Sequence, residues 1–219
     1  MQQRRTAAGL AGQAEFTLEY EPDALTERGI DWLVTGLEES IREGSRFPVG
    51  ETVGIGWLDC YVMDRGDGTL GLCEPDFVHF PPTLVAGASN ALEQLWFQRE
   101  IARSVGLEPE LDFPNNLQPA VTCAAFDAGL PAVLMHRYPH EEGESGWFIG
   151  CRGAVHEHTG TALRSATLYE LALAKPVIVG YLALPPDCSV VVGDGAPEIT
   201  RRNEVLIPEP GSLLAKMYS

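Results

Sequence analysis

The sequence predicts an α+β protein made of two small halves, each a mainly antiparallel sheet with packed helices. Three observations support this fold class. Short apolar stretches alternate with turn signals, of which the DRGDG segment at residues 64–68 is the clearest, and this is typical of hairpins. Two longer stretches, at residues 22–43 and 84–105, repeat apolar residues at spacings of three and four, as amphipathic helices do. Strands that follow one another directly favour hairpins over β-α-β crossovers.

The N-terminal half is expected to span residues 15–113, after a flexible tail at residues 1–14. It opens with a strand at residues 16–20 and a first helix, which begins at Pro22 and stops before Gly44. Residues 52–63 are rich in Val, Ile, Trp and Tyr and predict one strand, which turns back into another at residues 69–73. Thr83 can cap the second helix, and Gly106 follows that helix as a C-cap.

The C-terminal half is expected to span residues 119–219, because the preceding segment 108–119 contains three prolines and little apolar periodicity. Its predicted elements are strands at 120–126, 132–138 and 147–151, a short helix at 165–174, and strands at 177–184 and 189–192. The stretch at 177–184 is strongly apolar and is expected to be a buried strand. From Pro197 the chain mixes prolines with apolar residues, and we expect an irregular end.

The charge of the chain limits the classes of partner. It has 31 acidic and 15 basic residues, which give a formal net charge of −16. Such a field repels nucleic acid and anionic membrane surfaces, and it accelerates the encounter with a basic protein. No apolar run approaches the length of a membrane span, and the N-terminus lacks the apolar centre of a signal peptide, so we expect a cytoplasmic protein.

The cysteines and the common catalytic motifs point away from an enzyme. The five cysteines form no CxxC pair; they are Cys60, Cys73, Cys123, Cys151 and Cys188. Neither a disulfide framework nor a zinc ribbon has this pattern, and we expect buried thiols that pack as small apolar side chains. A nucleophile elbow fails because Trp147 stands where its closing glycine is needed. The sequence therefore predicts neither a cofactor nor catalysis.

The alternative is a metal-dependent enzyme built on a histidine cluster. Four of the five histidines lie close together in the sequence, namely His136, His140, His156 and His158. His156 and His158 would share one face of a strand, a spacing that suits metal ligands. Pro139 prevents His136 and His140 from forming a helical pair, so no fixed metal signature emerges.

The positive signal is an acidic loop beside an aromatic strand. Glu141, Glu142 and Glu144 can meet arginine or lysine of a basic partner through charge-assisted hydrogen bonds. Trp147 and Phe148 point to opposite faces of their strand, so at least one of them belongs to the core. We expect the contact site to consist of the three glutamates and Trp147.

The same region, residues 121–151, resembles the core of a bacterial immunity-protein family, number thirty-three in the numbered immunity series. The pattern is a strand with a cysteine, here Cys123, a strand that ends in arginine, here Arg137, an acidic segment, and then Ser145-Gly146-Trp147. The similarity covers roughly residues 119–195, and the N-terminal half is only loosely similar to the region preceding this domain in longer members. Many short members have an acidic cluster where this chain has RGAVH at residues 152–156.

The resemblance implies a protein without catalytic residues that binds and blocks a toxin made by its own cell. We therefore expect an immunity protein that occludes a cognate basic toxin, such as a nuclease effector of a contact-dependent system like type VI secretion. A second alternative is an adaptor or chaperone for secretion of that effector. An apolar strand left at a sheet edge would also allow a homodimer.

Overall fold

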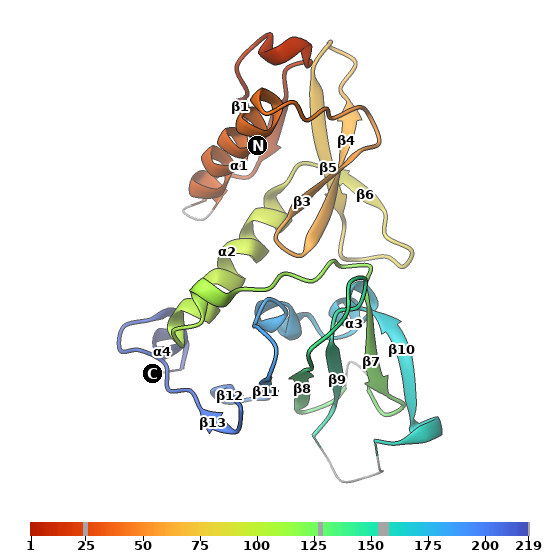
Figure 1. The fold of residues 1–219 in the computed structure, drawn as a ribbon, viewed down its shortest axis with the longest axis vertical. Coiled ribbons are helices and arrows are strands. Elements are labelled where there is room, and N and C mark those ends of the chain that lie inside the picture. The colour runs from red at the N-terminus through yellow and green to blue at the C-terminus, as the bar shows by residue number, and fades with distance from the viewer. Residues whose placement is uncertain (24–25, 127–128, 153–157, 219) are drawn as a thin grey trace. The chain divides into compact units, whose positions relative to one another are not determined.

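The computed structural model describes residues 1–23, 26–126, 129–152 and 158–218 of the chain (Figure 1). Helices and largely antiparallel sheets make up the structure, so the predicted α+β class is confirmed. The chain divides into two compact units, Met1–Trp96 and Phe97–Ser219. In the part of the chain that the structure describes, no helix is both long enough and apolar enough to cross a membrane.

The boundary between the units lies within helix α2 (Ser89–Ser104) and not in the proline-rich segment 108–119. Leu92, in the first half of α2, packs against Gly29 of the N-terminal unit. Phe97, in the second half, packs against Gly180 of the C-terminal unit. The prolines mark a change in local backbone, whereas the boundary depends on where each part of the helix surface is buried.

The N-terminal unit contains a two-stranded ribbon, one long helix and a four-stranded antiparallel sheet. The ribbon pairs β1 (Gln2–Arg5) with β2 (Thr17–Tyr20), and the 3-10 helix η1 (Leu10–Gly12) lies between them in sequence. Helix α1 is Thr26–Arg42, and its predicted apolar stripe is buried. The sheet consists, in order, of β3 (Thr52–Ile55), β4 (Leu58–Asp64), β5 (Leu70–Pro75) and β6 (Leu84–Ala86).

Three elements of this unit differ from the prediction. Residues 2–5, expected to belong to a flexible tail, pair with β2 along their whole length. Residues 52–63 form a tight hairpin instead of one strand, because Gly56 adopts a φ of 62° between β3 and β4. Residues 84–86 form strand β6 instead of the start of a helix, and Gly87, with a φ of 121°, separates that strand from α2.

Buried Glu74 explains why α2 begins at Ser89. Its carboxylate accepts hydrogen bonds from the backbone N–H groups of Asn90 and Ala91, at 3.0 and 2.8 Å. The first N–H groups of a helix have no partner within the helix, and an acceptor with negative charge stabilises them. Burial raises the pKa of Glu74, while these hydrogen bonds act in the opposite direction.

The C-terminal unit is built on a seven-stranded sheet with the order β10-β7-β9-β8-β11-β12-β13. Its neighbouring strands are antiparallel except for the parallel pair β7 and β9. The strands are β7 (Pro119–Cys123), β8 (Val133–Arg137), β9 (Trp147–Cys151), β10 (Leu163–Thr167), β11 (Cys188–Val192), β12 (Glu198–Arg201) and β13 (Glu204–Val205). The helices are α3 (Leu168–Ala174) and α4 (Leu213–Met217), with 3-10 helices η2 (Glu108–Glu110), η3 (Gly160–Ala162) and η4 (Pro176–Tyr181).

One face of this sheet is buried against the segment that contains η4. Met135, Ile149 and Val190 on that face are 0% exposed. The prediction of a strand at residues 177–184 was wrong, since η4 and a turn occupy this stretch. A short apolar run that is buried on all sides lacks the periodicity that separates a strand from a helix. Gly180 allows close packing here, because a Cβ at this position would lie 2.5 Å from Cε1 of Phe97.

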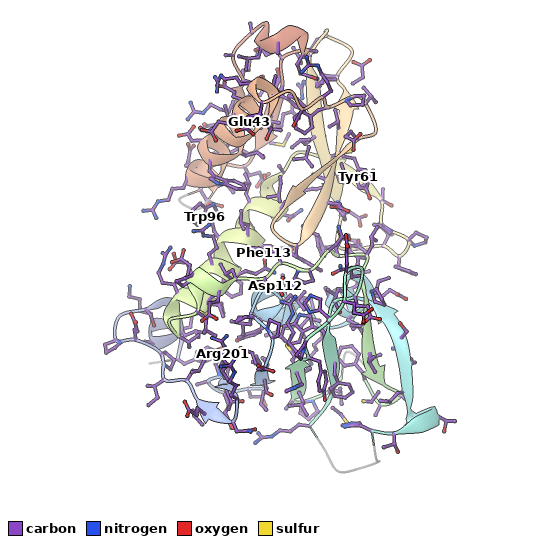
Figure 2. All side chains as sticks on the ribbon, in the orientation of Figure 1. Glu43, Tyr61, Trp96, Asp112, Phe113 and Arg201 are labelled. Carbon is purple, nitrogen blue, oxygen red and sulfur yellow. The ribbon has the colours of Figure 1, made fainter. Side chains whose placement is uncertain are left out.

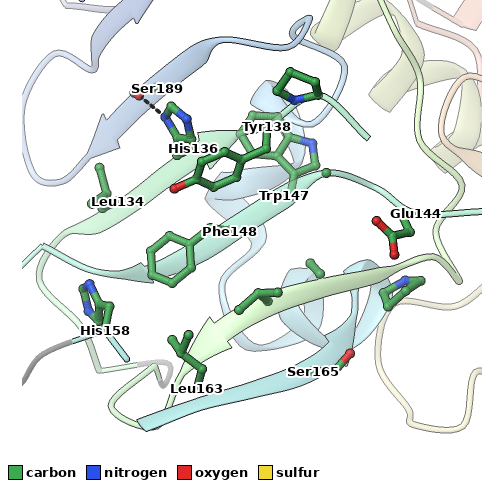
Figure 3. Close-up of a pocket in the computed structure, with 15 residues that line it drawn as sticks. Leu134, His136, Tyr138, Glu144, Trp147, Phe148, His158, Leu163, Ser165 and Ser189 are labelled. Carbon is green, nitrogen blue, oxygen red and sulfur yellow. Dashed lines mark hydrogen bonds between the residues drawn. The ribbon is translucent and has the colours of Figure 1, made fainter. Parts of the chain in front are cut away.

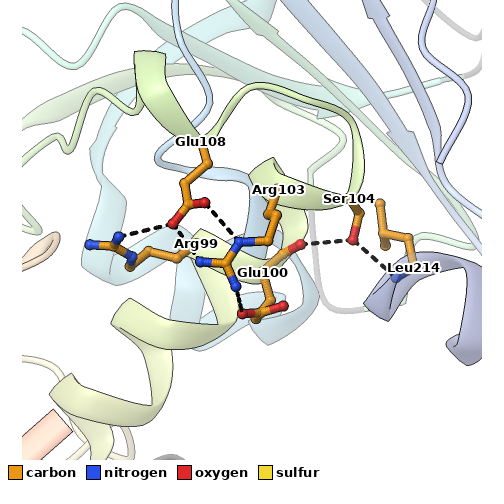
Figure 4. A network of polar contacts seen from close by, with 6 residues as sticks. All are labelled: Arg99, Glu100, Arg103, Ser104, Glu108 and Leu214. Atoms are coloured by element: carbon orange, nitrogen blue, oxygen red, sulfur yellow. Dashed lines mark hydrogen bonds and ion pairs between the residues drawn. The ribbon is translucent and has the colours of Figure 1, made fainter. Parts of the chain in front are cut away.

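The C-terminal end, expected to be irregular, adds β12, β13 and α4 to the unit. Ser104, at the end of α2, anchors α4 (Figure 4). The Ser104 hydroxyl accepts the N–H of Leu214 at 3.2 Å and donates to the carbonyl of Glu100 at 2.7 Å. A single hydroxyl thus joins two helices that are more than 100 residues apart in sequence.

Ion pairs tie the segment after α2 to the rest of the unit. Glu108 accepts hydrogen bonds from Arg103 at 2.7 Å and from Arg99 at 2.9 Å (Figure 4), and they lower the pKa of Glu108 to about 2. Arg201, labelled in Figure 2, donates two hydrogen bonds of 2.7 Å to the carboxylate of Glu110. Both glutamates of residues 108–110, at the start of the proline-rich segment 108–119, are therefore held by arginine side chains.

Candidate functional site

The Ser145-Gly146-Trp147 motif fixes the start of β9. The Ser145 hydroxyl donates to the carbonyl of Pro119 at 2.7 Å and accepts the N–H of Trp147 at 3.2 Å. Gly146 has a φ of 69°, and a Cβ there would lie 2.5 Å from the carbonyl oxygen of Tyr138. Trp147 is 1% exposed, and its indole N–H donates to the carbonyl of Leu182 at 3.0 Å. The side chains of this motif therefore stabilise the fold at the start of β9.

Arg137 lies next to this motif and is fully buried. Its Nη1 donates to the carbonyl oxygens of Leu184 at 2.7 Å, Leu182 at 3.2 Å and Asp112. Its Nη2 is 3.1 Å from Oδ2 of Asp112, and its guanidinium carbon is 5.6 Å from the centre of the Trp147 ring. Burial lowers the pKa of Arg137, and the nearby Asp112 carboxylate opposes that shift. Arg137 thus joins the end of β8 to two distant segments.

The opposite face of the sheet is open and forms the candidate site (Figure 3). A cavity of about 720 Å³ lies on it, with side chains from β7, β8, β9, β10 and β11. These side chains alternate with the buried ones along each strand. The lining is mainly apolar and aromatic with a few polar groups, and includes Val121, Leu134, His136, Tyr138, Glu144, Phe148, His158, Leu163, Ser165 and Ser189.

The exposed surface extends beyond the cavity itself. Tyr138 is 55% exposed and Val121 is 43% exposed, although both contribute to the lining. Phe148 is half-buried on the same face, whereas its neighbour Trp147 is buried on the other. The alternation confirms the prediction that at least one of these two rings belongs to the core. An apolar face of this kind is typical of a surface that another molecule covers.

His136 is the central polar group of the open face. Its Nδ1 lies 2.5 Å from the hydroxyl oxygen of Ser189, and its ring packs edge-on at 4.2 Å from the Tyr138 ring. Burial lowers the pKa of His136, so the neutral ring is favoured near pH 7. A serine nucleophile needs a carboxylate that orients its histidine. Among the hydrogen bonds of the described residues, none joins His136 to a carboxylate.

The predicted acidic residues lie at one end of this face. Glu141, Glu142 and Glu144 are exposed in the loop between β8 and β9, and Glu144 lines the cavity. A backbone hydrogen bond of 3.2 Å from Glu144 N–H to the Glu141 carbonyl closes the loop. The fourth predicted residue, Trp147, is 1% exposed and also contributes to the lining of the cavity.

The histidines of the alternative metal centre have separate partners. His136 contacts Ser189, while Nε2 of His140 lies 3.7 Å from Oδ2 of Asp112. His156 lies outside the described residues. In the described ranges, the one group of three or more candidate metal ligands with atoms within 4.8 Å of one another is Cys123, Cys151 and His158. The predicted four-histidine set is thus not assembled among the residues that the structure describes.

Sequence reasoning missed most of the open face. Val121, Leu134, Phe148 and Leu163 come from separate strands, and their convergence depends on the order in which those strands pair. The available signal was the alternation of β7, in which Pro119 and Val121 are exposed between buried residues. Such alternation indicates a strand with one open face, but it does not identify the neighbouring strands.

The C-terminal unit is built on a seven-stranded sheet that has a cavity on one face. Residues 97–202, just under half of the chain, match the family model of the Imm33-like domain. This match to an Imm33-like domain in the C-terminal half is what the resemblance in its sequence predicted. No match was found among curated proteins or among solved structures.

Proposed function

We propose that this protein is an immunity protein that binds a cognate antibacterial toxin through the open face of its seven-stranded sheet and neutralises it by occlusion. The observation that carries the proposal is the cavity of about 720 Å³ on a face that also presents exposed Val121 and Tyr138. The Imm33-like domain supports a protein partner in general, and the face supplies a surface for it.

The charges of the chain support a basic toxin. Glu141, Glu142 and Glu144 stand at one end of the open face, and the whole chain has a formal net charge of −16. Enzymes that act on nucleic acid carry basic surfaces because their substrate is anionic. A nuclease effector delivered by a contact-dependent system such as type VI secretion, and acting in the cytoplasm, is therefore our first candidate. The three carboxylates would oppose its cationic active site.

Apolar burial would supply most of the affinity, and charge would supply the rate and specificity. A specific complex buries about 800 Å² on each partner. Tyr138 and Phe148 provide aromatic area near the middle of the face, where the largest losses on alanine substitution occur. The glutamates at the edge would mainly accelerate association.

The first experiment co-expresses the chain with the toxin candidates encoded beside its gene, in cells that lack a secretion apparatus. An immunity protein restores growth and co-purifies with one of these toxins. Protection in the absence of the apparatus separates this role from that of a secretion adaptor. Cells that die while the chain is abundant and folded, for every adjacent toxin, would contradict the proposal.

The second experiment locates the contact surface by titration of the purified pair. We expect Tyr138→Ala to weaken binding by about 10- to 100-fold, which corresponds to about 1–3 kcal/mol. Trp32→Ala is the matched control, because Trp32 is an exposed aromatic residue, at 45%, in the N-terminal unit. An equal effect of both substitutions, or none of Tyr138→Ala, would place the contact elsewhere.

The acidic loop has its own test. Glu141, Glu142 and Glu144 are changed together to lysine, and the control changes the exposed residues Glu39, Glu43 and Glu51 of the N-terminal unit in the same way. Both variants alter the net charge equally. We expect a slower association rate and a flatter salt dependence only for the loop variant. Equal losses would show that net charge alone attracts the toxin, and unchanged binding would remove the loop from the contact.

A further inference from the structure

We propose that Cys123, Cys151 and His158 form a binding site for a single transition-metal ion, with Zn²⁺ as the expected occupant. Sulfur and nitrogen atoms of these side chains all lie within 4.8 Å of one another. The two cysteines are buried and the histidine is half-buried. This site shares His158 with the histidine cluster that the sequence suggested, but its other two ligands are cysteines. Its existence does not depend on the toxin.

The pairing of two parallel strands brings the cysteines together. In the parallel pair β7 and β9, Thr122 lies opposite Ile149, so Cys123 and Cys151 stand at the same end of the two strands. Gly150 leaves room for the Phe148 ring and for the Cys123 sulfur, because a Cβ at this position would lie 2.7 Å from Cζ of Phe148 and 3.2 Å from Sγ of Cys123. No local sequence motif could have indicated this group, since its two cysteines come from separate strands.

The distances suit tetrahedral coordination. Zinc binds cysteine sulfur at about 2.3 Å and histidine nitrogen at about 2.0–2.1 Å, which places sulfur and nitrogen ligands of one ion about 3.6 Å apart. Sγ of Cys151 and Nε2 of His158 are 3.4 Å apart. The donor set of two thiolates and one imidazole is typical of Zn²⁺, and two thiolates neutralise its charge in a buried position.

Neighbouring groups contact both the sulfur and the imidazole of this site. The backbone N–H of Cys151 donates to Sγ of Cys123 at 3.3 Å, and a donor of this kind stabilises a sulfur that carries negative charge. The rings of His158 and Phe148 pack with their centres 5.1 Å apart. His158 also lines the cavity of the open face, so a bound ion would fix one wall of that cavity. Three protein ligands leave one position of a tetrahedron for water or another donor.

The test uses the full chain, kept reduced, stripped of metal and titrated with Co²⁺ as a spectroscopic substitute for Zn²⁺. We expect saturation at one ion per chain, intense tetrahedral bands in the visible region, and a thiolate-to-cobalt charge-transfer band in the near ultraviolet. Zn²⁺ should displace Co²⁺ and raise the midpoint of thermal unfolding, since it binds the folded state alone. Absence of the charge-transfer band at saturating Co²⁺ would overturn the proposal.

Two variants and two controls identify the ligands. We expect His158→Ala to weaken Zn²⁺ binding at least tenfold, on the order of the loss seen when supporting groups of metal sites are removed. We expect Cys151→Ser to weaken Co²⁺ binding and to reduce the charge-transfer band, because Cys123 is then the one sulfur ligand of the group. The controls are His136→Ala, at a histidine that lines the same cavity, and Cys73→Ser, which removes another free thiol. Neither residue belongs to the proposed site, so both variants should bind Zn²⁺ normally. Circular dichroism confirms folding. Unchanged Zn²⁺ affinity in His158→Ala would refute the metal site.

Discussion

Replacement of Arg137 by methionine would measure how much the buried guanidinium stabilises the C-terminal unit. Nη1 of Arg137 donates to the carbonyl oxygens of Asp112, Leu182 and Leu184. Methionine is comparably long but donates no hydrogen bond. The Leu182 oxygen keeps the indole N–H of Trp147 at 3.0 Å, whereas the Asp112 and Leu184 oxygens lose the guanidinium donor.

The expected loss follows from these two carbonyl groups. A buried acceptor left without a donor costs about 1–3 kcal/mol, so two of them cost about 2–6 kcal/mol. The ion pair with Asp112 adds little, since that carboxylate is 39% exposed. The substitution also removes the cost of burying a charge. This cost is the reason why burial lowers the pKa of Arg137. We expect a net loss of about 2–4 kcal/mol in the free energy of unfolding of this unit.

The assay must follow the C-terminal unit alone, because a chain of two units need not unfold in one step. Hydrogen exchange of backbone amides in β8 and β9, measured against urea, reports that free energy. Arg164→Met, at an exposed position of β10, is the control and should change stability by less than about 0.5 kcal/mol. If Arg137→Met changes stability no more than this control, the hydrogen bonds of Arg137 merely offset the cost of its burial, and our reasoning fails.

Two further predictions concern the open face and its border. Burial lowers the pKa of His136, so the folded protein takes up a proton there less readily than the unfolded chain. The stability that neutral His136 contributes is complete above the ordinary pKa of histidine and is lost as the pH falls below that pKa. The unfolding of the C-terminal unit should therefore be less sensitive to acid in His136→Asn. Identical plots of stability against pH for the two proteins would exclude this role. Gly146→Ala should cost about 2 kcal/mol or more, from its left-handed backbone and from the contact with the Tyr138 carbonyl. Gly143→Ala is the control, because Gly143 has a φ of 92° and a Cβ there would meet no atom within 4 Å, so this substitution measures the backbone cost alone. Equal losses of stability in urea unfolding would show that the contact with the Tyr138 carbonyl is unimportant.

Local patterns predicted the elements whose burial is one-sided. The stripe of Ile30, Leu33, Leu37 and Ile41 is buried in α1 as its spacing indicated, and β11 lies where an apolar stretch suggested a strand. The stretch at 177–184 was misread because it is buried on all sides and therefore shows no periodicity. Residues 84–86 were misread because the start of α2 is fixed by Glu74, which lies 15 residues before Ser89 in the sequence.

The site was predictable only where it is continuous in sequence. Glu141, Glu142 and Glu144 belong to one loop, and the chain itself suggested their common role. The cavity, in contrast, combines side chains from five strands, and the cysteine pair depends on the parallel contact of β7 with β9. Strand order is a property of the whole fold, because the energy of each pairing depends on the burial of both partners.

Two sets of residues have different roles in the domain. One set carries the family resemblance, and the other lines the open face. Arg137, Ser145 and Trp147 hydrogen-bond to backbone carbonyl groups on the buried side, so a change in any of them acts first on the fold. Val121 and Tyr138 point outward and have no such role, so their side chains can vary without loss of the sheet. It follows that a motif of this kind identifies an Imm33-like scaffold. Under the proposed function, we expect substitutions on the outward face to change the partner before they change stability.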